Sequence, residues 1–112
     1  IEGSSVDISV FDQVRAAVGS AQTVLVMLDS NHTESHVLQE LELYSQIVTL
    51  GSYIVAHDGA QAWVWDIPRG VSEWKDDHPL GAIKKFVKFV YTMKTFLKFI
   101  LIKTVFVVFV IR

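Results

Sequence analysis

Residues 23–36 have the sequence Thr23-Val-Leu-Val-Met-Leu-Asp29-Ser-Asn-His32-Thr-Glu-Ser-His36, and this stretch decides the fold class. An apolar run rich in β-branched residues stops at an acid, and a polar loop and a helical pattern follow. Because the run has no polar alternation, it predicts a strand covered on both faces, as in a parallel sheet. A second run, residues 51–58, ends in the same way at His57-Asp58. Two such strands predict one pocket at the edge of a parallel sheet.

Two helical patterns accompany these runs, one before the first run and one between the two. Residues 1–5 resemble the last residue of a strand and a turn, in which Gly3 permits backbone conformations that other residues avoid. The apolar positions at helical spacing are Val10, Val14, Ala17 and Val18 before the first run, and Val37, Leu38, Leu41 and Tyr44 after it. The order β-α-β-α-β, with connections long enough for right-handed crossovers, predicts a Rossmann-like α/β fold: a parallel sheet with flanking helices.

The chain changes character after residue 58. Residues 59–79 contain three tryptophans and predict an irregular loop over the pocket, since long loops in compact domains often bind ligands. Trp63 and Trp65 are candidates for stacking on a substrate ring, although they are equally suited to filling a core under the loop. Pro79 suits the start of a further helix. Residues 104–111 are β-branched and uncharged, which favours a strand.

Composition excludes several classes of protein. The chain has 112 residues, enough for one modest domain, and no cysteine, so it has no disulfide and no thiolate nucleophile. This composition suits a cytoplasmic enzyme. Residues 1–78 carry a net charge of −9 and residues 79–112 a net charge of +7. Lysines interrupt every window of about 20 residues in the basic part, so we expect no membrane span, and we expect no nucleic-acid partner.

The acids at the strand ends are the first candidates for chemistry. Asp29 and Asp58 are 29 residues apart. Two converging carboxylates can hold Mg²⁺, and the same acids can instead cap the helices that follow their strands. His32 lies in the loop beside Asp29 and is a candidate general base. His36 is expected on a helix surface or in packing. No G-x-S-x-G or G-x-G-x-x-G motif is present.

Four segments together resemble one known family. They are Ile1-Glu-Gly-Ser-Ser5, residues 24–33, the H-V-L-x-E-L-x-x-Y pattern at residues 36–44, and residues 51–58. The chain resembles the cephalosporin hydroxylase / rhamnosyl O-methyltransferase family over roughly residues 1–88. That family is similar to class I methyltransferases dependent on S-adenosylmethionine.

The resemblance implies roles for particular residues. It implies transfer of a methyl group from S-adenosylmethionine to an oxygen of a sugar or other small hydroxylated metabolite. Asp29 and Asp58 would hold the metal, and His32 or His57 would assist deprotonation of the substrate. Residues near the methyl donor would be Glu2, Gly3, Ser4 and Ser5. The position of His57 is commonly acidic in the family, which makes the site less suited to a hard metal.

The resemblance also predicts an incomplete site. The family's Gly-rich donor motif lies upstream of the matched segments, so we expect these residues to be the C-terminal part of a methyltransferase domain. On its own, such a piece should bind the donor poorly, be inactive and form a homo-oligomer. We expect residues 1–88 to belong to that domain and residues 89–112 to be an atypical basic and apolar tail. The alternative function is a non-catalytic interaction module that uses this tail on a membrane or a partner.

Overall fold

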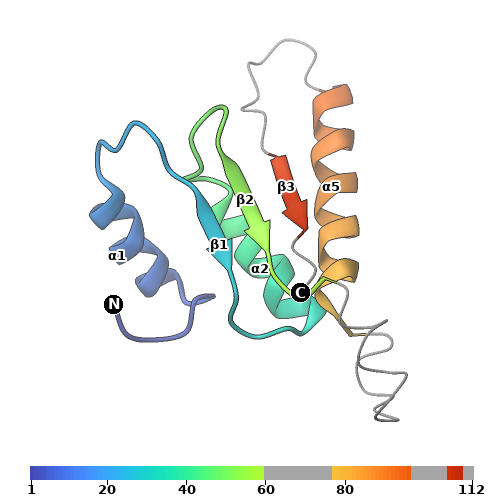
Figure 1. The fold of residues 1–112 in the computed structure, drawn as a ribbon, viewed down its shortest axis with the longest axis horizontal. Helices are drawn as coiled ribbons and strands as arrows, with labels where there is room; N and C mark the ends of the chain where they lie inside the picture. The colour runs from blue at the N-terminus through green and yellow to red at the C-terminus, as the bar shows by residue number, and fades with distance from the viewer. Residues whose placement is uncertain (60–76, 97–105, 110–112) are drawn as a thin grey trace.

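The computed structural model describes residues 1–59, 77–96 and 106–109. In chain order the elements are α1 (Ile8–Val18), β1 (Val26–Leu28), α2 (Glu34–Tyr44), β2 (Tyr53–Ala56), α5 (Pro79–Phe96) and β3 (Phe106–Phe109) (Figure 1). Trp63 and Trp65, with most of the predicted loop over the pocket, lie outside the described residues. The alternation of helices and strands confirms the α/β class.

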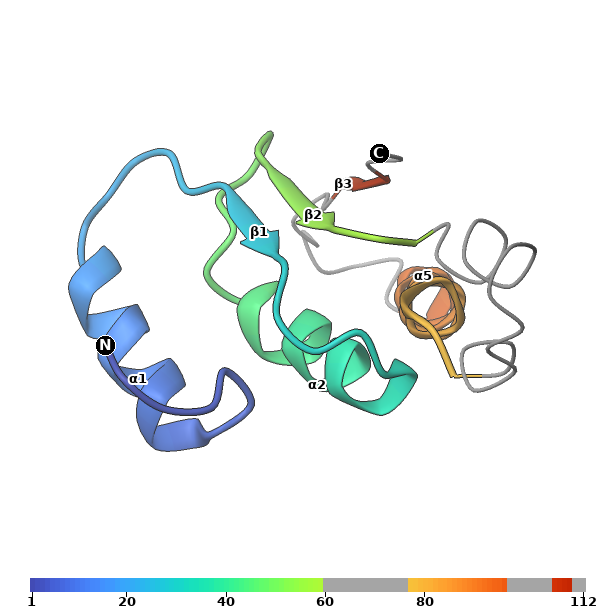
Figure 2. The same cartoon turned by 60° about the horizontal axis from the view of Figure 1, so that its bottom comes forward.

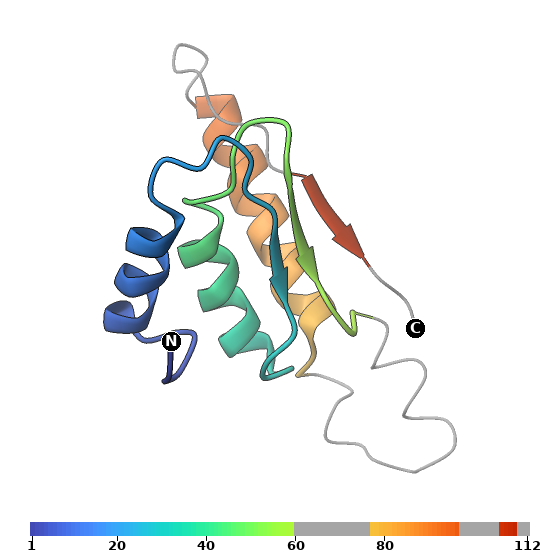
Figure 3. The same cartoon turned by 60° about the vertical axis from the view of Figure 1, so that its left-hand side comes forward.

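The strands form one parallel sheet in the order β1-β2-β3. Leu28 is in register with Ala56, and Ala56 with Phe109. The three labelled helices lie on one side of this sheet, as two different views show (Figures 2 and 3). The fold is therefore a parallel sheet with flanking helices, as predicted, but in the described residues the helices form a single layer.

The prediction that the first strand is covered on both faces is wrong. Leu28 points toward the helices and is buried, whereas Met27 is 58% exposed and Tyr53 is 45% exposed. Neighbouring residues of a strand point to opposite faces, so an unbroken apolar run does not by itself show that both faces are covered. The homo-oligomer, which could cover such a face, stays a prediction.

Helix α1 begins and ends where local chemistry requires it. The Asp7 carboxylate accepts a hydrogen bond from the Ser9 backbone N–H, and Gly19 ends the helix with a φ of 52°. The predicted apolar face was partly wrong, because Ala17 is exposed and Phe11 is buried. Phe11 packs edge-on against Tyr44 of α2, with ring centroids 5.4 Å apart. This aromatic contact rotates the buried face of α1 toward α2.

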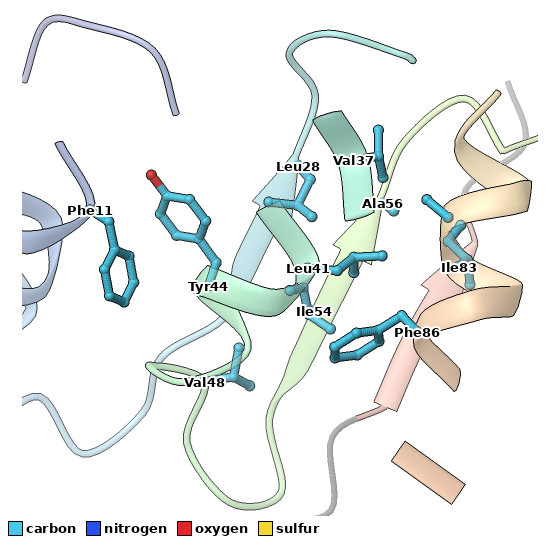
Figure 4. Packing of buried hydrophobic residues seen from close by; sticks show 11 residues of the cluster. Phe11, Leu28, Val37, Leu41, Tyr44, Val48, Ile54, Ala56, Ile83 and Phe86 are labelled. Atoms are coloured by element: carbon cyan, nitrogen blue, oxygen red, sulfur yellow. The ribbon is translucent and has the colours of Figure 1, made fainter. Parts of the chain in front are cut away.

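Helix α2 is the centre of the hydrophobic core. Its predicted stripe is confirmed, since Val37, Leu41 and Tyr44 are buried and Leu38 is partly buried. Leu41 lies between Ile54 of the sheet and Ile83 of α5 in Figure 4, and all three side chains are almost wholly shielded from solvent. The core therefore depends on α2 contacting the sheet on one side and α5 on the other.

The two ends of the chain differ from the predicted order. Residues 1–5 form no strand, so the predicted first strand is absent there. The third strand is β3, which lies within the segment 104–111 that was expected to be strand-like. Helix α5 starts at Pro79 as expected and continues past residue 88. The division of the chain at residue 88 stays a prediction.

The apolar face of α5 is buried against the rest of the fold. Ala82, Ile83 and Phe86 are buried in the core, while Lys84 and Lys88 are exposed. A helix that lies on a membrane must present an apolar face to the lipid. Among the described residues, no helix is long and apolar enough to cross a membrane. The described part of this helix therefore gives no support to the alternative of a membrane-binding module.

Candidate functional site

The parallel register brings the ends of β1 and β2 to the same edge of the sheet. The pairing of Leu28 with Ala56 is followed by a hydrogen bond from the His57 backbone N–H to the Leu28 carbonyl, at 2.9 Å. Asp29 and His57 therefore leave the sheet side by side, and Asp58 follows one residue later. This placement follows from strand direction and register alone.

Four predicted residues converge at this edge. His32 Nε2 lies 3.3 Å from Asp58 Oδ2 and 3.7 Å from Asp29 Oδ1. His57 Nδ1 lies 3.6 Å from Asp29 Oδ1, and the His57 side chain is buried. The structure thus joins both predicted metal ligands to both predicted general bases. Their roles stay predictions.

Asp58 has an unusual backbone conformation. Its φ is 53°, and it is the only described residue other than glycine with a positive φ. Aspartate and asparagine tolerate this left-handed region better than most residues. The turn directs the Asp58 carboxylate back toward His32, and strained residues of this kind often occur at functional sites.

The donor set fits a divalent cation. One ligand atom each from Asp29, His32 and Asp58 can be chosen so that all lie within 4.8 Å of one another. Ligand atoms bound at about 2.1 Å to one ion lie about 3 to 4.2 Å apart, and the two contacts of His32 Nε2, 3.3 and 3.7 Å, fall in this range. Two carboxylates suit Mg²⁺ or Mn²⁺, whereas the imidazole favours a softer ion such as Zn²⁺.

A second polar cluster lies next to this site, and it was not predicted from the sequence. The Ser30 hydroxyl donates a hydrogen bond of 2.7 Å to Glu40 Oε1. His36 Nε2 lies 3.0 Å from Ser5 Oγ and 3.2 Å from Ser30 Oγ. Glu40 is only 2% exposed, although it lies on a helix that carries other acids on its surface. The i, i+4 spacing of His36 and Glu40 was the available signal, since such residues share a helix face.

One of the predicted donor-side residues, Ser5, borders a cavity. A cavity of about 310 Å³ is lined by Ser5, Ser30, Glu40, Tyr44, Asp29 and the three residues of β1. Ser5 is half-buried there, and its carbonyl accepts a hydrogen bond of 3.0 Å from the Tyr44 hydroxyl. The side chains of Glu2 and Ser4 are exposed, and the φ of Gly3 is 132°, where a Cβ would lie 2.6 Å from Val10. The structure therefore brings Ser5, alone of the four, into a cavity shared with Asp29.

Tyr44 should make stability depend on alkaline pH. Its pKa is raised above the ordinary value of 10.0, first by burial and second by the negative charge of Glu40. The unfolded chain therefore loses this proton at a lower pH than the folded chain does. The corresponding stabilisation is complete below pH 10 and is lost as the pH rises through the folded-state pKa.

We expect Tyr44→Phe to remove this part of the pH dependence. The variant should also lose about 0.5 to 1.5 kcal/mol at neutral pH, because it lacks the hydrogen bond to Ser5. Urea titrations of both proteins between pH 7 and 11 would measure this. Tyr53→Phe is the control, since Tyr53 is 45% exposed whereas Tyr44 is buried. Parallel alkaline profiles for wild type and Tyr44→Phe would contradict the prediction.

Comparison with known proteins identifies the family. The profile described as Rhamnosyl O-methyltransferase/CmcI matches residues 1–106, which is most of the chain and reaches the first residue of β3. Neither the curated proteins nor the solved structures gave a significant match. The family match covers the acids at the ends of β1 and β2 and both polar clusters. The chain therefore belongs to the rhamnosyl O-methyltransferase/CmcI family.

Proposed function

We propose that this protein takes part in O-methyl transfer from S-adenosylmethionine to a hydroxyl group of a sugar or other small hydroxylated metabolite. One observation carries the proposal. In a chain of an O-methyltransferase family, Asp29, His32 and Asp58 converge at the carboxyl ends of parallel strands, beside a cavity that reaches Ser5. Ligands of open α/β sheets bind at such strand ends.

Each group at this edge has a place in that chemistry. A divalent cation, when bound, would bring the substrate hydroxyl close to the donor and make its proton easier to remove. Asp29 and Asp58 supply the negative oxygen ligands for such an ion, and His32 lies between them as a third ligand. His57 is then the imidazole best placed to accept the hydroxyl proton, because it contacts Asp29 without belonging to that ligand group.

The negative charges of the site suit a methyl donor whose sulfur is positively charged. The donor supplies a methyl group on a positively charged sulfur, and the acceptor oxygen loses a proton. Asp29 and Glu40 border the same cavity and give it a negative character that favours a cation. Ser5 lines it from the opposite loop, where its hydroxyl can contact a polar group of the donor. Catalysis here would rest on positioning and on electrostatic stabilisation.

Donor binding can be tested even where it is weak. In an amide-resolved NMR titration, we expect S-adenosylmethionine to shift the resonances of Ser5 and Ser30, because both residues line the cavity. S-adenosylhomocysteine should shift the same signals, and adenosine triphosphate, whose phosphates would meet Asp29 and Glu40, should not. The affinity of this chain should be low, as its sequence has no Gly-rich donor motif. Tight stoichiometric binding would contradict the low affinity, and the absence of any shift would contradict the proposed function.

A further inference from the structure

We propose that Ser5, Ser30, His36 and Glu40 form a hydrogen-bonded bridge between the loop before α1 and the loop after β1. In this bridge, His36 and Glu40 are positioning residues for the Asp29 site. The bridge couples the donor-side loop to the metal-side loop. A ligand bound at one loop therefore changes the position of side chains in the other. The inference rests on the proposed function, because it assigns a form of control to the same site.

The bridge is continuous from one loop to the other. Ser30 Oγ is within 3.4 Å of Ser5 Oγ and 3.2 Å of His36 Nε2. A hydroxyl carries one hydrogen, and Ser30 donates it to Glu40, so Ser30 Oγ meets its other partners as an acceptor. His36 Nε2 carries at most one hydrogen, so Ser30 Oγ and Ser5 Oγ share this donor, and Ser30 is contacted by groups from two other parts of the chain.

Glu40 anchors the bridge in the interior. A carboxylate that is 2% exposed is costly unless it is paired and hydrogen-bonded. Its Oε1 atom contacts Ser30 at 2.7 Å and His36 Nε2 at 3.6 Å. Its Oε2 atom is buried without a hydrogen-bond partner among the described residues. Buried polar groups of native proteins are mostly satisfied, so this carboxylate is retained at a cost to stability, which points to a role beyond packing.

The bridge acts on the metal site through the backbone. Ser30 follows Asp29 directly, so fixing the Ser30 side chain limits how far the backbone that carries Asp29 can move. At the other end, Ser5 is fixed twice, by His36 and by the Tyr44 hydroxyl on its carbonyl. The partners that orient metal ligands strongly affect metal affinity. A movement of Asp29 on binding an ion therefore reaches His36 and Ser5 through Ser30.

Histidine NMR tests this coupling with Mg²⁺ alone as the probe. In the wild-type chain, Mg²⁺ should shift the ring signals of both His32 and His36, although His36 is outside the proposed ligand group. In Ser30→Ala, we expect the His36 shift to disappear and the Kd for Mg²⁺, measured at His32, to rise about 10-fold. Glu40→Leu should behave in the same way. Glu40→Gln retains an oxygen that accepts from Ser30, so it should restore most of the coupling.

Matched variants separate coupling from general damage. Ser35→Ala and Glu42→Gln change the same residue types at exposed positions of α2, and both should leave the Kd and both shifts unchanged. A direct electrostatic effect of Mg²⁺ on His36 would persist in Ser30→Ala, which would overturn the coupling. If Glu40→Leu fails to fold, the result for Ser30→Ala still shows whether the two loops are coupled.

The two possible failures are distinguishable. A wild-type chain in which Mg²⁺ shifts neither histidine would overturn the metal site of the proposed function and the coupling with it. If Mg²⁺ shifts the His32 signals but its Kd is the same in wild type and in Ser30→Ala, the coupling is overturned and the metal site is not.

Discussion

Leu41→Ala should lower the free energy of unfolding by about 2 to 5 kcal/mol, because it leaves a cavity where the leucine was fully buried. Leu41 is 0% exposed and lies where α2, the sheet and α5 meet. Domains of this size are stable by only about 5 to 15 kcal/mol. The helices of the described structure cover one face of the sheet, so little other apolar contact is available to offset the loss. The loss is therefore a large share of the total stability, and we expect a clearly lower urea midpoint for the variant.

Urea denaturation followed by circular dichroism measures this effect. Leu50→Ala is the matched control, since Leu50 is 64% exposed and the same atoms are removed. The control should stay within about 0.5 kcal/mol of wild type. Equal midpoints for the two variants, with equal slopes, would show that α2 is not the centre of the core.

Asp29→Asn should weaken binding of a divalent cation by about 100-fold or more, which corresponds to about 2.8 kcal/mol. Changes to residues that merely orient metal ligands already cost about 10- to 100-fold, and Asp29 is a proposed ligand. The carboxamide keeps the size of the side chain and removes its negative charge. Asp58→Asn should have a similar effect, and asparagine tolerates the positive φ of 53° at that position.

Calorimetry with Mg²⁺ and with Mn²⁺ checks this expectation. Asp12→Asn is a close control, because the Asp12 side chain is 52% exposed and that of Asp29 is 48% exposed. It should leave both titrations unchanged. We expect Mn²⁺ to bind more tightly than Mg²⁺, since the site includes an imidazole. Unaltered metal affinity in both Asp29→Asn and Asp58→Asn would remove these acids from the metal site.

The site at the strand ends was predictable from sequence for a simple reason. The order of apolar runs and helical patterns along the chain predicts parallel strands, and parallel strands bring the residues that follow each of them to one edge. Asp29, His32, His57 and Asp58 were all named on this basis. The orientation of each side chain was not predictable, since it depends on the turn at Asp58 and its φ of 53°.

The second cluster shows where sequence patterns stop being informative. Glu40 has the spacing of a helix residue beside the apolar stripe, and most glutamates there are exposed. Its burial depends on the loop of residues 3–5 folding over α2, held by Tyr44 and His36. Contacts between segments more than 30 residues apart leave no periodic pattern in the sequence, so only the tertiary structure reveals them.

The sequence by itself determined the α/β class, the position of β2 within residues 51–58, the apolar stripe of α2 and the edge of the sheet where polar groups collect. These follow from periodicity and from residues that start and end helices, which are local properties. The tertiary structure alone decided that the helices of the described residues lie on one face, that Phe11 turns α1 toward Tyr44, and that Glu40 is buried beside Ser30. These depend on which surfaces meet once the chain has folded, and burial is a property of the whole assembly of elements rather than of any one segment.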